Sequence, residues 1–275
     1  MRLSSKGWFR AVCVALAIQS SSCRKPPSKP EPARNNGPSA VARVPRPAPS
    51  AKGTAAADGN LDTFRRLFAL SEAGEAFISD NVVSNETSLL QPASALASLQ
   101  GGAYIGVGPE QNFTYIALSR PELAVVIDLR RDNALLHLLY KSLFDLAASR
   151  LEFLCVLLGR PYDPKFEPSI DSHVDALLAS VAGITPTRDW FDQQHARLVE
   201  RIRSYNLNLS DTDVARIRHV HELFFERQLD LRFELRKANG RRYPSYKQLL
   251  ALRSVSGVGT FLDSRESAAR WWLPI

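Results

Sequence analysis

Cysteine is scarce in this sequence, and the common motifs of metal centres and nucleophilic hydrolases are missing. Three cysteines occur among 275 residues, and no CxxC pair, HExxH helix or nucleophile-elbow motif is present. His219 and His221 are two residues apart, so they point to different faces of a helix, which argues against a metal pair. We therefore expect no metal, and we expect Cys155 to be an inert core residue.

The part of the chain expected to fold also lacks an excess of basic residues. Residues 1–58 contain 10 of the 35 Lys and Arg residues and 2 of the 28 Asp and Glu residues, which leaves 25 basic and 26 acidic residues in the remainder. The net charge of +7 therefore belongs to the N-terminal segment. Because nucleic-acid binding depends on clustered Lys and Arg, no nucleic-acid partner is indicated.

The N-terminal segment has no apolar run long enough to span a bilayer as a helix, but residues 1–22 have the plan of an export signal. A basic start at Arg2, Lys6 and Arg10 precedes a short apolar core over 11–18. Cys23 follows three serines, which resembles a bacterial lipoprotein cleavage site. We expect lipidation at Cys23, attachment to a membrane and a location in the cell envelope. If the start is misassigned, the protein is cytoplasmic.

Composition divides the rest of the chain into three parts. Residues 23–58 are rich in proline, alanine and serine, and we expect a disordered linker because such a segment buries little apolar surface. We expect an α/β core over 59–160, with the first helix capped by Asn60. Residues 161–275 have helical periodicity and predict a helical insertion or lid.

Two features of the expected helices are specific enough to test. The run from Asn133 to Leu158 is apolar nearly all round, which predicts one long buried helix. His137 lies near its start, where we expect a hydrogen-bonded core histidine. Ser210 and Asp213 form a capping-box pattern that predicts the start of a later helix.

The stretch 101–133 predicts a strand, a glycine turn, a helix and a second strand. Its first apolar run, 103–107, is followed by Gly108 and Pro109, and proline suits the first turn of a helix. Its second apolar run ends at Asp128. Apolar runs without alternation predict strands covered on both faces, as in a parallel sheet. The stretch therefore predicts a right-handed βαβ unit with any ligand at the carboxyl ends of its strands.

The residues of the turn indicate an adenosine-containing cofactor. Gly106 and Gly108 allow a tight bend and a close ligand, and the helix start offers free N–H groups. Asp128, about 20 residues further on, can accept hydrogen bonds from ribose hydroxyls. Gln111 replaces the third glycine of the dinucleotide fingerprint, and Glu110 places a negative charge where a pyrophosphate would bind. S-adenosylmethionine (SAM) fits better, because it carries an ammonium and a sulfonium but no phosphate.

This stretch resembles motif I and the following acidic strand end of the class I SAM-dependent methyltransferases. More narrowly, the segments 79–81, 84–87 and 106–113 resemble an uncharacterised bacterial family with a methyltransferase-like fold. Tyr104 stands at the usual acidic position of motif I. The resemblance implies a Rossmann-like fold in which SAM contacts Gly106, Gly108, Glu110 and Asp128. A segment that closes over the cofactor would contribute pocket residues, together with the turn: Asp80, Asn81, Asn85, Glu86 and Asn112.

The sequence leaves two functions open. Two strands are fewer than the roughly five of a doubly wound fold, so we expect an incomplete sheet and a chain shortened at its C-terminus relative to its relatives. SAM is a cytoplasmic metabolite, which conflicts with export. One hypothesis is a SAM-dependent methyltransferase-like domain with an unknown acceptor. The alternative is a non-catalytic, envelope-tethered binding or structural protein on a degenerate Rossmann-like scaffold.

Overall fold

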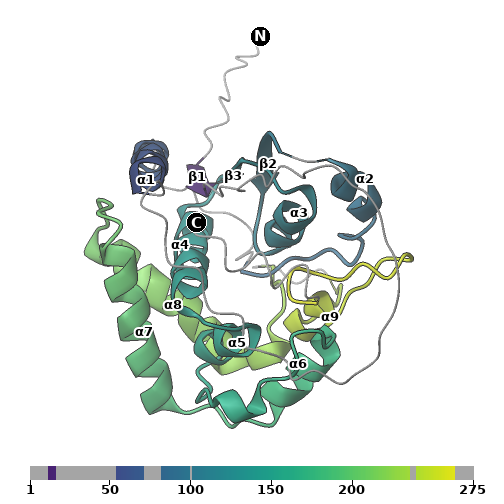
Figure 1. The fold of residues 1–275 in the computed structure, drawn as a ribbon. Helices are drawn as coiled ribbons and strands as arrows, with labels where there is room; N and C mark the ends of the chain where they lie inside the picture. Colours follow the sequence, from purple (N-terminus) through teal and green to yellow (C-terminus); the bar gives the residue numbers. More distant parts are fainter. Residues whose placement is uncertain (1–11, 17–53, 71–81, 100, 236–239, 264–275) are drawn as a thin grey trace, which may run out of the picture.

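A computed structural model of the chain describes residues 12–16, 54–70, 82–99, 101–235 and 240–263. The fold is mixed α/β, and more than half of the described residues are helical (Figure 1). The elements in chain order are β1 (Val12–Leu16), α1 (Thr54–Ala69), α2 (Ala93–Ser98), β2 (Ala103–Val107), α3 (Gln111–Ser119), β3 (Leu123–Asp128), α4 (Arg131–Leu146), α5 (Arg150–Leu157), η1 (Pro164–Phe166), α6 (Val174–Ala182), α7 (Arg188–Arg203), α8 (Asp211–Arg227), η2 (Gln228–Asp230) and α9 (Tyr246–Leu250).

The sheet places the carboxyl ends of two parallel strands at one edge. β2 and β3 run parallel, with Val107 opposite Ile127, and α3 connects them. β1 pairs antiparallel with the other side of β3, so the strand order is β1-β3-β2. The predicted strand–helix–strand unit is therefore confirmed. No helix in the described ranges is long and apolar enough to cross a membrane.

The described helices cover only one face of the parallel strands. Gly106 on β2 and Ala124 and Val126 on β3 are buried. Ile105 and Val107 point to the other face and are 69% and 62% exposed. The prediction of strands covered on both faces is wrong for β2 within the described ranges, whereas Val125 of β3, opposite Ile105, is partly buried against the core. α3, the crossover between the two parallel strands, packs on the face that holds Gly106, and β2 is an edge strand of the described sheet, so Ile105 and Val107 receive no cover on the other face.

The main core surrounds α4. Its inward residues are fully buried, among them Leu135, Leu138, Leu139 and Leu143. α4 contacts α7 and α8, and Figure 1 shows α5 to α9 lying on the far side of α4 from the sheet. The helical C-terminal half therefore completes the core that the small sheet alone does not supply.

The single helix predicted over 133–158 is divided into α4 and α5. The chain between them is extended at Ser149, whose hydroxyl accepts a hydrogen bond from the backbone N–H of Glu152 at 3.0 Å. A serine N-cap of this kind starts a new helix, and the apolar periodicity hid it. The first helix also differs from its prediction, because α1 begins at Thr54, before Asn60. The capping box of α8 at Ser210 is confirmed.

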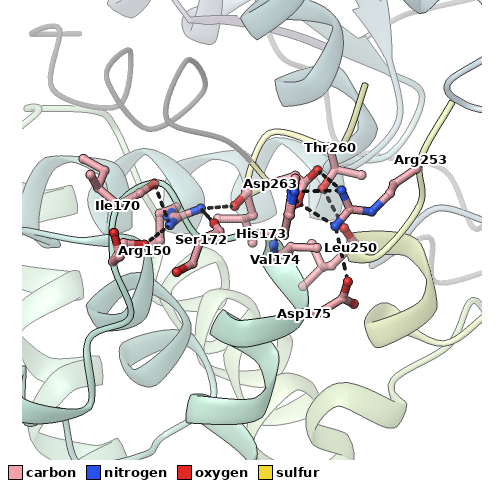
Figure 2. Close-up of polar contacts among 12 residues, drawn as sticks. Arg150, Ile170, Ser172, His173, Val174, Asp175, Leu250, Arg253, Thr260 and Asp263 are labelled. Carbon is pink, nitrogen blue, oxygen red and sulfur yellow. Dashed lines mark hydrogen bonds and ion pairs between the residues drawn. The ribbon is translucent and has the colours of Figure 1, made fainter. Parts of the chain in front are cut away.

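Buried polar contacts fasten the last described segment to α5 and α6 (Figure 2). Asp263, which is 2% exposed, accepts a hydrogen bond from the backbone N–H of Val174 at 2.8 Å and forms an ion pair with Arg253 at 3.1 Å. The guanidinium of Arg150 donates to the backbone carbonyl oxygens of Ser169, Ile170, Ser172 and Leu262. These contacts hold the segment 253–263 against the helices that follow the βαβ unit.

Candidate functional site

The glycine turn lies at the carboxyl edge of the sheet, as the sequence predicts. Gly108 follows β2 and adopts a φ of +87°, a left-handed conformation that favours glycine. Since Val107 faces Ile127 across the parallel pair, Gly108 lies next to Asp128. The structure therefore brings Gly106, Gly108 and Asp128 to one edge.

The space beside Gly106 is filled by two side chains of the protein itself, Asn112 and Tyr104. A Cβ at position 106 would lie 1.9 Å from Asn112 Oδ1 and 2.5 Å from the hydroxyl oxygen of Tyr104. The Tyr104 hydroxyl donates to Asn112 Oδ1 at 2.7 Å. Asn112 Nδ2 donates to the carbonyl oxygens of Val107 at 3.2 Å, Gly108 at 2.9 Å and Pro109 at 2.7 Å. Asn112 thus closes the turn from within by hydrogen bonds to three consecutive carbonyls.

The carbonyl of Gly108 is also bound from α4. Asn133 Nδ2 donates to it at 3.1 Å, and His137 Nε2 lies 2.9 Å from it. A carbonyl only accepts, so Nε2 of His137 carries the proton and Nδ1 is left as an acceptor. Burial lowers the pKa of His137 to about 4. The prediction of a hydrogen-bonded core histidine is therefore confirmed, and its partner is the glycine turn.

Glu110 joins the turn to the segment at 84–87. Its carboxyl group is buried, and both of its oxygens accept from the backbone N–H of Ser84 at 3.1 Å. Burial raises the pKa of Glu110 to about 7, although hydrogen bonds from the backbone of Ser84 and of Glu110 itself act in the opposite direction. A carboxylate at the start of α3 disfavours a phosphate there, because like charges repel.

The other predicted pocket residues are less closely gathered. Asn85 is partly exposed, and Glu86 is exposed and accepts from the Ser88 hydroxyl at 3.2 Å. Asp80, Asn81 and the predicted lipidation site Cys23 lie outside the described residues. Only part of the predicted closing segment can therefore be placed, and that part is held at Ser84 by Glu110.

Asp128 is engaged by the start of α4. One of its oxygens accepts from the backbone N–H of Arg130 at 2.9 Å and lies 3.5 Å from Arg130 Nε. Its side chain is 10% exposed. In this position the negative charge of the carboxylate stabilises the N-terminal end of α4, where the helix dipole is positive. Its predicted role in holding a ribose remains a prediction.

One face of α4 carries buried polar residues that the sequence analysis did not predict. Asn133, His137 and Tyr140 follow one another at helical spacing, and Tyr246 of α9 is buried nearby, where it raises the pKa of Tyr140 beyond the effect of burial. Polar residues at i, i+4 and i+7 within an otherwise apolar helix were the available signal. The apolar pattern of the rest of the helix masked it.

A histidine pair between α7 and α8 was also missed. His195 Nδ1 lies 3.0 Å from His221 Nδ1, and His221 Nε2 lies 3.1 Å from the carbonyl oxygen of Val156. Burial lowers the pKa values of His195 and His221 to about 4 and about 3. Both rings are therefore neutral at pH 7. No group of three or more His, Cys, Asp or Glu side chains suited to a metal occurs among the residues described.

Cys155 is fully buried in α5, and burial raises the pKa of its thiol to about 12. A thiol in this state is protonated and unreactive. The prediction of an inert core cysteine is confirmed.

Comparison with known proteins yields one family match. A family model described as "Domain of unknown function (DUF7790)" matches residues 81–159. No curated protein matches the sequence. The matched stretch runs from the segment anchored by Glu110 to the end of α5, so it contains the glycine turn, Asp128 and the polar face of α4. The chain is thus similar, over less than a third of its length, to a family whose description assigns no activity.

Proposed function

We propose that this chain is a non-catalytic binding domain on a degenerate Rossmann-like, methyltransferase-type scaffold, tethered to the cell envelope by its N-terminal segment. The observation that carries the proposal is the position of Asn112. A cofactor held by the turn needs the space beside Gly106 and the polar groups of the turn, and Asn112 takes both. The domain is therefore built around a closed turn.

The hydrogen bonds of Asn112 stabilise the closed turn against opening. The two N–H donors of its amide are shared among three carbonyl oxygens, and its Oδ1 accepts from Tyr104. Each such bond contributes about 1 kcal/mol net, and a buried acceptor left unpaired costs about 1–3 kcal/mol. A ligand entering beside Gly106 would have to replace these bonds. Glu110 and Asp128 are likewise engaged, by the backbone N–H groups of Ser84 and Arg130.

Calorimetric titration of the full-length protein with SAM, and with its demethylated product, tests the proposal. We expect no saturable heat at millimolar ligand. Saturable binding in the micromolar range would refute a closed, non-catalytic turn. The proposal also gains support if SAM fails to raise the melting temperature, since a ligand that binds the folded state stabilises it.

The second candidate is a SAM-dependent methyltransferase, with the acceptor unknown. The adjacency of Gly108 and Asp128 at the ends of two parallel strands favours it. This candidate requires SAM binding that is lost in Asp128→Ala. Asp132→Ala is the matched control, because Asp132 is half exposed and pairs with Arg216 on the surface. Equal loss in both variants, or no binding in the wild type, would remove this candidate.

The envelope tether is tested separately from the binding function. If Cys23 carries a lipid, the protein is recovered in the membrane fraction and Cys23→Ser moves it to the soluble fraction. Cys13→Ser is the control, since Cys13, in strand β1, lies within the predicted leader and is not the predicted acceptor. Membrane recovery that persists in Cys23→Ser, or wild-type protein found wholly in the cytosol, contradicts the tether.

A further inference from the structure

One strand of the sheet lies in the part of the chain that is expected to be removed on export. β1 (Val12–Leu16) falls within the predicted leader, residues 1–22, and cleavage before Cys23 would detach it. All five residues of β1 pair antiparallel with β3. The leader therefore occupies a position in the fold that the processed protein leaves open.

Three elements border the position of β1. One is the edge of β3 (Leu123–Asp128), and the other two are α1 and α4, which also contact β1. Figure 1 shows β1 between α1 and β3. Both helices have contacts of their own with the rest of the fold. α4 contacts β3, α7 and α8, and Arg65 of α1 donates from Nε to the carbonyl oxygen of Tyr205 at 2.8 Å. The elements around this position are therefore held in place without the leader.

The strand β3 has none of the residues that protect an open sheet edge. Residues 123–127 include no charged residue and no proline, and natural proteins use both to keep an edge from pairing. Ala124 and Val126 are buried, at 0% and 1% exposed. Without β1, the backbone N–H and C=O groups on this edge lose their partners, and each such hydrogen bond contributes about 1 kcal/mol net. The freed edge of β3 is therefore a template for another strand.

The pairing of β1 specifies the kind of strand that fits. The strand runs antiparallel to β3 and extends over five residues, about 17 Å at the usual rise per residue. Its residues opposite Ala124 and Val126 lie on the same face as those buried side chains, so a charge there would be buried without a partner. The leader has Leu16 and Val14 at these two positions. Proline is excluded because it lacks the N–H donor of the ladder. An extended, uncharged, apolar segment meets these conditions.

We propose that the edge of β3 binds an extended apolar segment of a partner protein, and that the leader fills this site until cleavage removes it. The partner's segment then takes the register that β1 has in the structure. The inference rests on the proposed tethered binding domain and deepens it, because it names the chemistry of what is bound. The site is separate from the closed space beside Gly106, since β1 and β2 lie on opposite sides of β3.

The probe is a fluorescent synthetic peptide of residues 10–18 carrying Cys13→Ala, and its control peptide also carries Val14→Pro. Fluorescence anisotropy follows the titration of each peptide with processed protein purified from membranes, and with precursor made without membranes so that the leader stays attached. We expect the processed protein to bind the probe saturably and the proline peptide at least about tenfold more weakly, because proline removes a ladder hydrogen bond. The attached leader competes at an effective concentration on the order of 1 mM, so the precursor should bind a probe of about 10 µM affinity roughly 100-fold more weakly.

Two variants of the full chain locate the site. Val14→Pro in the leader of the precursor frees the edge of β3 without cleavage, so this precursor should bind the probe nearly as tightly as the processed protein; its melting transition shows that it folds. Ile105→Lys is the matched control, because Ile105 is 69% exposed on β2, at the other edge of the sheet. It should leave probe binding unchanged. Bound probe should slow hydrogen exchange in residues 123–128 and not in residues 103–107.

Equal binding of the two peptides, loss of binding in Ile105→Lys, or protection of residues 103–107 would overturn the inference. So would a processed protein that rejects the probe, including one in which the β3 edges of two copies pair with each other. Mass spectrometry tests the cleavage by itself. An intact leader contradicts the tether, and the Val14→Pro precursor then still decides whether β3 accepts a strand. SAM binding in the separate titration would refute the non-catalytic function and leave the strand site standing.

Discussion

A methyl group added at Gly106 should destabilise the protein, and removing the Asn112 side chain should relieve much of that effect. The Cβ of Gly106→Ala would lie 1.9 Å from Asn112 Oδ1, far inside van der Waals contact. The same Cβ would lie 2.5 Å from the Tyr104 hydroxyl oxygen, so Asn112 must move and the Tyr104 ring must shift, which breaks the bonds of Asn112 to Tyr104 and to the turn carbonyls. If Asn112 fills the turn, the two substitutions act on the same space, and their effects on the free energy of unfolding are not additive.

The magnitudes follow from the contacts. Overpacking costs about 1–3 kcal/mol, and the lost hydrogen bonds bring Gly106→Ala to about 3 kcal/mol. Asn112→Ala should cost about 2 kcal/mol, because the carbonyl of Gly108 retains two other donors while the Tyr104 hydroxyl loses its partner. If the two substitutions acted independently, the double variant would lose about 5 kcal/mol of stability. The double variant should lose only about 2–3 kcal/mol of stability, which corresponds to a coupling of about 2–3 kcal/mol.

Urea unfolding of the four proteins at pH 7, with the slope held common, measures these values. Gly257→Ala is the control, since its strain arises from a φ of +81° and a Cβ there would meet nothing within 4 Å. It should be additive with Asn112→Ala. Additivity of Gly106→Ala and Asn112→Ala within about 0.5 kcal/mol would refute the reasoning that Asn112 fills the turn.

Three further predictions concern buried charge. Burial raises the pKa of Glu110 to about 7, so the stability of the wild type falls as the pH rises from about 4.5 through 7. Glu110→Gln should therefore stabilise the protein by up to roughly 3 kcal/mol at pH 8 and change its stability little at pH 4. Urea unfolding at both pH values measures this difference. Asp263→Asn should cost about 3 kcal/mol in the same assay by leaving Arg253 without its buried partner, and the exposed Asp171→Asn should change little. Burial lowers the pKa of His221 to about 3, so the stability of the wild type falls as the pH drops from about 6.5 towards 3. His221→Leu should therefore lose less stability than the wild type between pH 6.5 and 4. An unchanged dependence of stability on pH in this variant would contradict the prediction.

Local sequence signals were sufficient for the βαβ unit. The two apolar runs, the glycines of the turn and Pro109 each act on their own stretch of backbone, so strands and turn lie where they were predicted. The capping box at Ser210 is equally local. The cap at Ser149 is local too, yet the surrounding apolar pattern outweighed it and concealed the break between α4 and α5.

The sequence by itself determined that a glycine turn and an acidic strand end would occur, because strand, turn and helix propensities act over a few residues. Only the tertiary structure decided what those residues contact. Glu110 bonds to Ser84 and His137 bonds to Gly108, which are 26 and 29 residues apart in sequence. The exposed face of β2 and the closed space beside Gly106 also depend on how helices pack on the sheet. Such partnerships follow from the folded arrangement, in which distant segments compete for the same volume and the same hydrogen bonds.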